Sequence, residues 1–579
     1  MKVFKLWRQN RTRIFIASIM SMVLVATVMP QYALACTGVY VGKDVAVNGK
    51  AIFARSEDIG SANTKLFVIH EAENYKDGEV YSDSVGFSIP YPQQSLKYSA
   101  MEDSPDAGEG GRPFGSAGTN EAGLAVSATI SATPNEKIQA ADPFVESGIT
   151  ELSIAGVVLM QCKTAREGIE FLGDIVQTTG AGEGNIIFMG DEKEVWYMEI
   201  LSGHQYVATK LADDISFVLP NDYMLTTVDT KSPDVIASKN IHEVAKKAGT
   251  LTEEGGKINV KQSYAQPFGD YDVYRATAGL YLTTGVNYDP EEVRNMDLRV
   301  NPGKKLSKTD VMDILRTRYE GTKYDANLPE NAGIRVIGTA RQAETHLFEI
   351  QQDAGAVLAA TQWQSIGNSE FSAYLPYFTS LMTETPEAYR VKDIEYNPQS
   401  AYWKVRSLAT FCALDRENYG SGVRQYLDSY QDSLIASNAQ IEPQLESLYN
   451  TDPKLASGFA NKYAQVITSD YLSTIDSLYS QLTTHIAREQ GEDERLKDIG
   501  AFVPTQLSQE IITPYSFDSI LQMSAPVQNT ISPDALVQDS AENAPKNIDF
   551  NPITVLGLLA IGATLVAIVF VSMRKREDE

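Results

Sequence analysis

The sequence predicts an α+β protein in which strands and helices occur in separate blocks. Short apolar or alternating runs typical of strands recur before residue 210, and longer segments with helical periodicity lie between groups of them. From about residue 402 to 488 the pattern is mainly helical. Because strands and helices do not alternate one by one, an α+β arrangement fits better than a chain of βαβ units.

We expect strands at 38–43, 51–54, 65–70, 124–130, 185–189, 195–200 and 205–209, and 345–350 also alternates like a strand. We expect helices at 149–161, 165–177 and 234–247. The helical region that begins near residue 401 is predicted to be an added subdomain packed on the strand-rich body.

The composition indicates a folded and strongly acidic chain. Its 579 residues include 49 Lys and Arg against 75 Asp and Glu, which gives a formal net charge of −26. A surface this acidic repels phosphate, so nucleic acid is excluded as a partner. Hydrophobic residues make up 43% and aromatic residues 9%, enough to build a core and to exclude pervasive disorder.

The N-terminal 35 residues have the three-part layout of a secretory signal peptide. A basic stretch without acidic residues precedes an apolar run at 14–29, and Pro30 and the triplet Ala33-Leu34-Ala35 follow. Cleavage after Ala35 would make Cys36 the first residue of the mature chain. An uncleaved anchor and a lipoprotein signal acylated at Cys36 are the alternatives, but Ala33 and Leu34 stand in the reverse of the usual lipoprotein order.

The C-terminal end predicts a membrane anchor. Residues 553–573 form a 21-residue uncharged apolar run, long enough for a hydrocarbon core of roughly 30 Å, and Arg574-Lys575-Arg576 follow at once. The expected order is therefore a signal peptide (1–35), a catalytic domain (36–400), a helical subdomain (401–490), a polar stalk (491–552), a transmembrane helix (553–573) and a cytoplasmic tail (574–579). This order predicts a single-pass protein of the cell membrane whose body is extracellular.

Three cysteines, Cys36, Cys162 and Cys412, cannot all pair within one chain. Cys162 and Cys412 lie in apolar stretches and are expected to be buried, and whether they form a disulfide is left open. Cys36 differs because cleavage would place a free α-amine on the same residue as its thiol. An α-amine titrates near pH 8, so it can act as the base for its own side chain.

A series of ordered motifs resembles one enzyme family. They are CTGVYVGK at 36–43, NG at 48–49, AIFARSED at 51–58, NEAGLAV at 120–126, VWYME at 195–199, VLPN at 218–221, YR at 274–275 and YEGTKYD at 319–325. Together they resemble the dipeptidase A family of N-terminal-nucleophile cysteine hydrolases, whose superfamily includes penicillin V acylase and bile salt hydrolase. The resemblance covers roughly residues 36–490. It implies a four-layer α-β-β-α sandwich and hydrolysis of dipeptides.

Arg55 and Asp58 are candidate partners of the nucleophile. A guanidinium beside a thiol stabilises the thiolate, which Arg55 could do if a hairpin folds it back beside Cys36; a plain salt bridge with Glu57 or Asp58 is the alternative. Asp58 cannot share a strand face with Arg55, so one of them must lie at a bend. The resemblance implies that Asp58 accepts hydrogen bonds from the α-amine of Cys36; otherwise it is a turn residue.

Three further site residues follow from the resemblance. Asn120 is expected to be the oxyanion-hole donor, although its surroundings also suit a turn residue. Asn221 is expected to hold the amine of the nucleophile or the substrate, and Arg275 is expected near the site.

The sequence contains no motif for zinc binding, serine catalysis or nucleotide binding. No two of the five histidines share a zinc-binding spacing, no G-x-S-x-G occurs, and the glycine-rich loop at 108–113 lacks the lysine of a Walker motif. We therefore expect no metal and no cofactor. A Cys–His pair with His346 is conceivable, but His346 reads as a pocket or structural residue.

A dipeptide pocket should contain both a carboxylate and a basic group, and Glu199 and Arg275 are the candidates for binding the substrate. Two alternatives stay open: an acylase acting on N-acyl amides, and a non-catalytic membrane or wall-binding protein lipidated at Cys36. Whether the chain forms a homo-oligomer is also left open.

Overall fold

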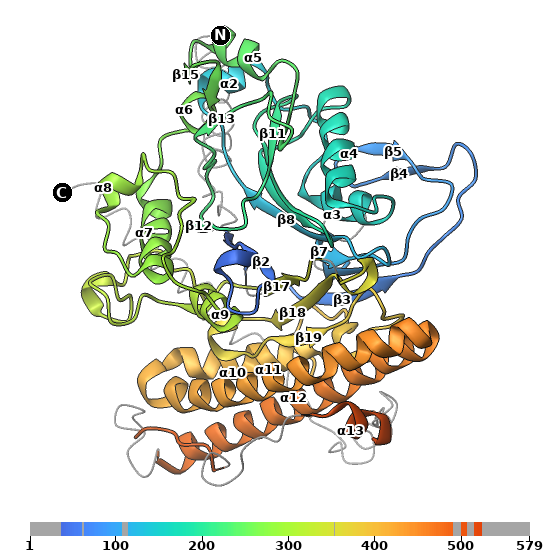
Figure 1. Ribbon diagram of the computed structural model, residues 1–579. Helices are drawn as coiled ribbons and strands as arrows, with labels where there is room; N and C mark the ends of the chain where they lie inside the picture. The colour runs from blue at the N-terminus through green and yellow to red at the C-terminus, as the bar shows by residue number, and fades with distance from the viewer. Residues whose placement is uncertain are drawn as a thin grey trace, which may run out of the picture. The chain divides into compact units, whose positions relative to one another are not determined.

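A computed structural model describes residues 36–60, 63–106, 114–352, 354–489, 500–505 and 515–523. Two large sheets with antiparallel strand pairs lie at its centre (Figure 1). The six-stranded sheet has the order β12 (Ser216–Leu219), β1 (Thr37–Val41), β2 (Ala51–Glu57), β17 (Glu344–Ile350), β18 (Ala360–Ile366) and β19 (Leu375–Tyr377). The eight-stranded sheet has the order β14 (Val235–Ala237), β11 (Tyr206–Lys210), β10 (Val195–Ile200), β9 (Asn185–Gly190), β8 (Ala125–Ser131), β7 (Gly115–Thr119), β6 (Tyr98–Asp103) and β3 (Lys65–His70).

Shorter strands and the helices complete the described part. The short strands are β4 (Val80–Ser82), β5 (Ser88–Pro90), β13 (Thr227–Val228), β15 (Glu253–Glu254) and β16 (Lys257–Asn259). The helices are α2 (Glu136–Ala141), α3 (Glu151–Leu159), α4 (Ala165–Thr178), α5 (Ile241–Ala248), α6 (Val260–Tyr264), α7 (Asp270–Thr284), α8 (Pro290–Val293), α9 (Lys308–Arg316), α10 (Ala401–Leu414), α11 (Ser421–Thr451), α12 (Pro453–Glu489) and α13 (Phe517–Gln522).

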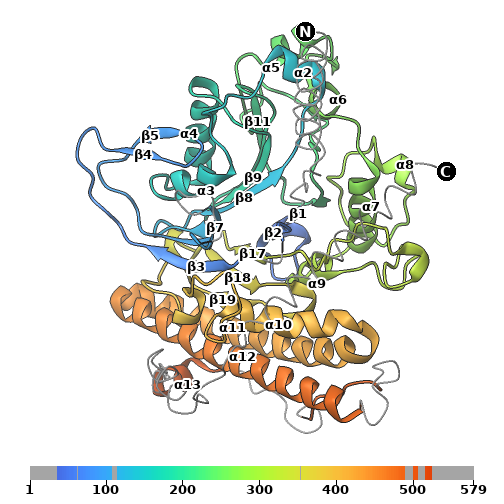
Figure 2. The same ribbon diagram turned by 180° about the vertical axis from the view of Figure 1, so that it is seen from behind.

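The elements stack as helices, sheet, sheet and helices. Helices α3 and α4 cover the outer face of the eight-stranded sheet, and their apolar side chains form one core with it. Helices α9 to α12 cover the outer face of the six-stranded sheet and share a second core with it (Figure 1). The same order is visible from behind, with the orange helices α10–α12 on one side and α3 and α4 on the other (Figure 2).

A third core fills the space between the two sheets. Its centre is a group of aromatic rings in mutual contact, with Phe53 stacked on Phe188 and Phe217 packed against Tyr40 and Tyr197. Strand alternation selects which side chains enter this space. In β17, for example, Phe348 points between the sheets while Leu347 joins the helix-side core.

Local sequence explains how the first strands are placed. The hairpin from β1 to β2 turns at Asn48-Gly49, where Gly49 has φ +71°, a conformation that favours glycine. Helix α4 is capped at its N-terminus by Thr164, whose side chain accepts a hydrogen bond from the backbone N–H of Glu167 at 3.2 Å. The hairpin brings the residues after β2 back beside the start of β1, which positions the site described below.

The predicted α+β class is confirmed, as is the helical C-terminal part. The strands expected at 65–70 and 195–200 match β3 and β10, and the strand expected at 345–350 is β17. The helix expected at 234–247 is partly wrong, because Val235–Ala237 forms the edge strand β14 and the helix begins only at Ile241. This strand depends on pairing with β11, which a local pattern does not reveal.

The predicted signal peptide (1–35), transmembrane segment (553–573) and tail lie outside the described residues, as does most of the predicted stalk. Among the residues that are described, no helix has both the length and the apolar composition needed to cross a membrane.

Candidate active site

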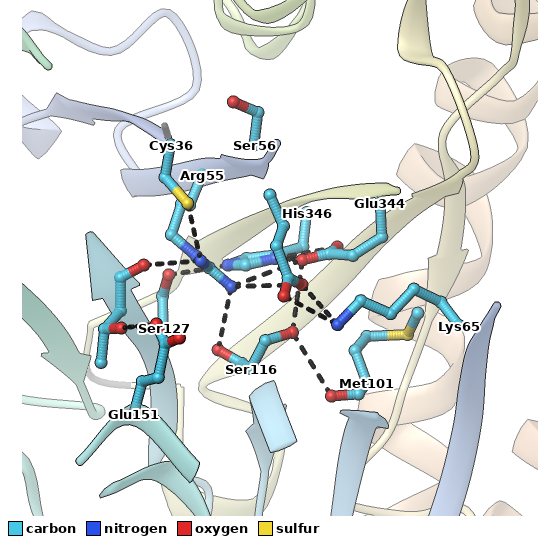
Figure 3. Close-up of polar contacts among 12 residues, drawn as sticks. Cys36, Arg55, Ser56, Lys65, Met101, Ser116, Ser127, Glu151, Glu344 and His346 are labelled. Carbon is cyan, nitrogen blue, oxygen red and sulfur yellow. Dashed lines mark hydrogen bonds and ion pairs between the residues drawn. The ribbon is translucent and has the colours of Figure 1, made fainter. Parts of the chain in front are cut away.

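Cys36 lies directly before β1, at the edge of the core between the two sheets. Its side chain is only 3% exposed. Figure 3 shows the sulfur pointing toward the guanidinium of Arg55. The thiol is thus enclosed at the edge of this core.

Arg55 reaches the thiol from the neighbouring strand β2. Its Nη1 is 3.4 Å from Sγ of Cys36 and donates to the carbonyl oxygen of Thr129 at 2.6 Å. Its Nη2 lies 3.7 Å from Glu57 and 3.6 Å from Glu344. Arg55 was expected to be either a partner of the thiol or a partner in an ion pair. It is both, because Nη1 contacts the thiol and Nη2 faces the two carboxylates.

Asp58 follows the last residue of β2, at the bend that the sequence required between Arg55 and Asp58. Its backbone hydrogen-bonds the Cys36 thiol. Its Oδ2 accepts a hydrogen bond from Arg335, whereas Oδ1 is buried without a hydrogen-bond donor in ordinary geometry among the described residues. Burial raises the pKa of Asp58, and the nearby guanidinium groups of Arg335 and Arg275 oppose that rise.

Arg275, on helix α7, holds the backbone on the other side of the thiol. Its Nη1 donates to the carbonyl oxygen of Cys36 and, at 3.1 Å, to Oγ1 of Thr37. Its Nη2 donates to Oδ1 of Asn221 at 2.9 Å and to Asp272. The side chain is completely buried, so these hydrogen bonds fix the first residue of β1 against α7.

Asn221 lies just after β12, the strand that pairs with β1. Besides its contact with Arg275, its Nδ2 donates to the carbonyl oxygen of Ser131 at 2.9 Å, which ties it to the end of β8 in the opposite sheet. The structure thus brings Cys36, Arg55, Asp58, Asn221 and Arg275 into one group.

Asn120 is not brought into this group. Its Nδ2 donates to the carbonyl oxygens of Leu159 and Cys162 at 3.0 and 2.7 Å, and its Oδ1 accepts from the backbone N–H groups of Ala122 and Leu124. Both amide hydrogens are therefore engaged in holding the β7–β8 turn against the end of α3. This arrangement fits the alternative of a turn residue, and the oxyanion-hole role expected for Asn120 stays a prediction.

Glu199 also lies apart from the cysteine. On β10 it faces the space between the sheets and is completely buried, and its Oε1 accepts hydrogen bonds from the Tyr197 hydroxyl at 2.7 Å and from the backbone N–H groups of Met224 and Leu225. Burial raises its pKa to about 7. The hydrogen bonds from Met224 and Leu225 tie the loop after β12 to β10, whereas Oε2 is buried without a hydrogen-bond partner among the described residues. The substrate-binding role expected for Glu199 stays a prediction.

The thiol is neutral in the chain that still carries residues 1–35. Burial raises the pKa of Cys36 to about 12; Arg55 opposes this rise, and the carboxylates of Asp58 and Glu57 add to it. Thiolate chemistry at neutral pH therefore requires a base close to the sulfur.

Several residues of the site carry no sequence signal of their own. Arg335 contacts Asp58 across 277 positions of sequence, and Glu344 and His346 approach Arg55 from β17. The prediction of a structural or pocket role for His346 agrees with its complete burial, since its ring contacts Ser127 at 2.7 Å and Glu344 at 3.0 Å. Only the strand-like alternation at 345–350 hinted that these residues face a core.

Cys162 and Cys412 are free and buried, so they form no disulfide in this structure. In the described part of the chain, no group of three or more His, Cys, Asp or Glu side chains is arranged to hold a metal ion.

Comparison with known proteins places the chain in a family. The model of "Peptidase family C69" matches residues 35–429. A "Probable dipeptidase B" from Streptococcus pyogenes serotype M1 is 34% identical over 457 residues, which cover 76% of this chain and 91% of that protein. A "Probable dipeptidase" from Salmonella dublin is 32% identical over 61% of this chain and 83% of its own length, and one from Latilactobacillus sakei is 28% identical over 78% and 95%. The resemblance inferred from the motifs is confirmed: the chain belongs to peptidase family C69.

Proposed function

We propose that this peptidase is a dipeptidase whose nucleophile is the thiolate of Cys36, freed as the N-terminal residue by cleavage after Ala35. The relatives named as probable dipeptidases support the substrate class. The family match begins at residue 35, one position before the cysteine. The observation that carries the proposal is the contact of Arg55 with Sγ of Cys36 inside the core between the sheets.

The chemistry uses groups on one residue and its neighbours. The α-amine of Cys36 takes the thiol proton, and the sulfur attacks the carbonyl carbon of the peptide bond to form a tetrahedral intermediate. The protonated amine then gives its proton to the leaving amino acid, and the carbon–nitrogen bond breaks to leave a thioester. Water, deprotonated by the same amine, hydrolyses the thioester and restores the thiol.

The surrounding residues suit this sequence of steps. Arg55 stabilises the negative sulfur. Oδ1 of Asp58 is the acceptor for the new α-amine in this proposal, because it is buried beside Cys36 and has no hydrogen-bond partner at normal distance among the described residues; the Ser56 hydroxyl is the other donor near this carboxyl. Arg275 holds the Cys36 carbonyl and Asn221, and thereby fixes the direction of the amine and the sulfur.

The stacking order of helices, sheet, sheet and helices supports assignment of the fold to the N-terminal-nucleophile hydrolases. In this architecture the first residue of a central strand lies between the sheets, where Cys36 is found. In this proposal Cys36 is both the residue at the start of β1 and the nucleophile.

One extra residue ahead of Cys36 should abolish most of the activity. We expect kcat/KM for dipeptides to fall by about 10²-fold or more when the chain begins at Ala35, because general base catalysis typically contributes 10²–10⁴-fold. Both forms can be made by cleaving a fusion tag at the two positions and checking each N-terminus by mass spectrometry. Equal rates would rule out the α-amine as base, and a preference for N-acyl amides over dipeptides in the same assay would favour an acylase.

The proposal extends to export and anchoring, which the segments 1–35 and 553–573 predict. We expect the full chain, produced in a bacterial host, to be found in the membrane fraction with an unmodified N-terminal Cys36, and its body to be digested by protease added to intact cells. A chain lacking residues 553–579 should appear in the medium. A diacylglyceryl mass on Cys36, or a protected body that retains residues 1–35, would contradict this topology.

A further inference from the structure

A layer of buried charged side chains lies directly behind Arg55, on the side away from the thiol (Figure 3). Strands β2 and β17 are paired so that His346 is opposite Arg55 and Glu344 is opposite Glu57. All four side chains are essentially inaccessible to solvent. The register therefore places a carboxylate and an imidazole against the guanidinium that contacts the sulfur of Cys36.

Glu344 is held in place by several donors. Its Oε1 accepts from Nδ1 of His346 at 3.0 Å and from the Ser116 hydroxyl at 3.4 Å, and its Oε2 accepts from Nε2 of Gln364 at 2.8 Å. The other ring nitrogen of His346 contacts the Ser127 hydroxyl at 2.7 Å, which fixes the imidazole between the sheets. Although burial alone would raise it, the pKa of Glu344 is held well below its usual range by His346 and Arg55.

The two ends of Arg55 therefore face two different anions. Nη1 is 3.4 Å from the Cys36 sulfur, and Nη2 is 3.6 Å from Oε1 of Glu344. We propose that Glu344, oriented by His346, is a positioning residue that competes with the Cys36 thiolate for the charge of Arg55 and so sets the reactivity of the nucleophile. This inference rests on the proposed role of Cys36.

The charges around this competition come from every element packed against it. They are Cys36 beside β1, Arg55 and Glu57 on β2, Asp58 after it, Lys65 on β3, Asp103 on β6, Glu151 on α3, Glu344 and His346 on β17, and Arg275 and Arg335, which face Asp58. Lys65 pairs with Glu57 and Asp103 at 2.8 and 2.7 Å. Arg55 is therefore the cation that lies next to Glu344, Glu57 and the thiolate. Arg55 thus faces the thiol and two carboxylates, those of Glu344 and Glu57, and Glu57 is also paired with Lys65.

The direction of the effect follows from like-charge repulsion. A carboxylate near the thiolate disfavours the charged form of the sulfur, and removal of that carboxylate favours the charged form. We therefore expect Glu344→Gln to lower the apparent pKa of the acidic limb of kcat/KM by roughly 0.5 to 1 pH unit, less than the 1–3 units of a direct charge contact because Arg55 lies between the two groups. The rate of Cys36 alkylation by iodoacetamide should shift by a similar amount.

The experiment uses the processed full chain, with Cys36 alkylation followed by peptide mass mapping so that Cys162 and Cys412 do not contribute. Glu349→Gln is the matched control: Glu349 is a second buried carboxylate on β17 that pairs with Lys308 and accepts from Trp363 at 2.7 Å on the strand face turned to the helices. It should leave the Cys36 profile unchanged. Glu344→Asp keeps the negative charge but moves it away from Arg55. It should lower the apparent pKa of the acidic limb by less than Glu344→Gln does.

The outcomes separate this inference from the proposed function. An unshifted profile in a folded Glu344→Gln protein, or equal shifts for Glu344→Gln and Glu349→Gln, overturns the role of Glu344 while leaving Cys36 as nucleophile. If Glu344→Gln does not fold, the Glu344→Asp profile decides, and no shift there overturns the inference. Dipeptide hydrolysis that survives in Cys36→Ser overturns the proposed function instead.

Discussion

Replacing Cys36 by serine is expected to reduce kcat/KM for dipeptide hydrolysis by at least about 10³-fold, the scale of loss found when a hydrolase nucleophile is removed. A serine hydroxyl ionises far less readily than a thiol, so the contact with Arg55 that favours a negative sulfur gains little from an alkoxide. The measurement is steady-state hydrolysis of a dipeptide panel by the processed full chain. Folding of the variant is checked by its thermal transition.

Cys162 supplies the control for this variant. Cys162 is buried and free like Cys36, but it lies just after α3 in the core on the outer face of the eight-stranded sheet. Cys162→Ala should cost some stability through a small cavity while leaving kcat/KM within a factor of about two. A Cys36→Ser protein that keeps a tenth of the activity, or a Cys162→Ala protein that loses as much, would show that the nucleophile lies elsewhere.

Replacing Arg55 by methionine is expected to lower the free energy of unfolding by about 3–5 kcal/mol, because removing one partner of a buried ion pair leaves uncompensated charge inside the protein. The guanidinium is 1% exposed and lies between Glu57 and Glu344, which would face each other without it. Dipeptidase activity should fall as well, since the thiolate loses its cation. Urea unfolding measures the first effect and steady-state kinetics the second.

Two comparisons give this prediction its specificity. Arg166→Met removes a half-exposed guanidinium that pairs with Glu194 at 3.3 Å, and it should cost less than about 1 kcal/mol. The double variant Arg55→Met with Glu344→Gln should recover part of the lost stability, because the unpaired carboxylate is gone. If Arg55→Met costs no more than Arg166→Met, the buried charges are not held by Arg55.

The sequence predicted those residues of the site that have a recognisable pattern in the neighbouring sequence. The A-x-A triplet singled out Cys36, and the spacing of Arg55 and Asp58 required the bend that occurs after β2. Strand β2 itself was predicted too short, because Arg55 and Glu57 do not look like residues of a buried strand. They are buried only because Lys65 and Glu344, from two other strands, neutralise them.

The parts that were missed depend on contacts between distant segments. Nothing near Arg335 indicates that it reaches Asp58, and nothing near Asn120 indicates that Leu159 and Cys162 occupy its amide. A motif gives the type of a residue and its neighbours along the chain, whereas the role of a polar side chain depends on which donors and acceptors remain for it after folding. Asn120 was assigned to the site by the family resemblance and Glu199 by residue type. In the folded chain the Asn120 amide donates to Leu159 and Cys162, and Oε1 of Glu199 accepts from Tyr197, Met224 and Leu225.

The position of β1 in its sheet also governs when this enzyme can become active during its own synthesis. Cys36 emerges from the ribosome among the first residues, but β1 pairs with β12 and β2 pairs with β17, strands that begin at Ser216 and Glu344. The thiol therefore gains its neighbours only after some three hundred more residues have been added. A nascent or truncated chain therefore carries Cys36 without the strands that pair around it, and this late pairing adds a second requirement to the proposed cleavage after Ala35.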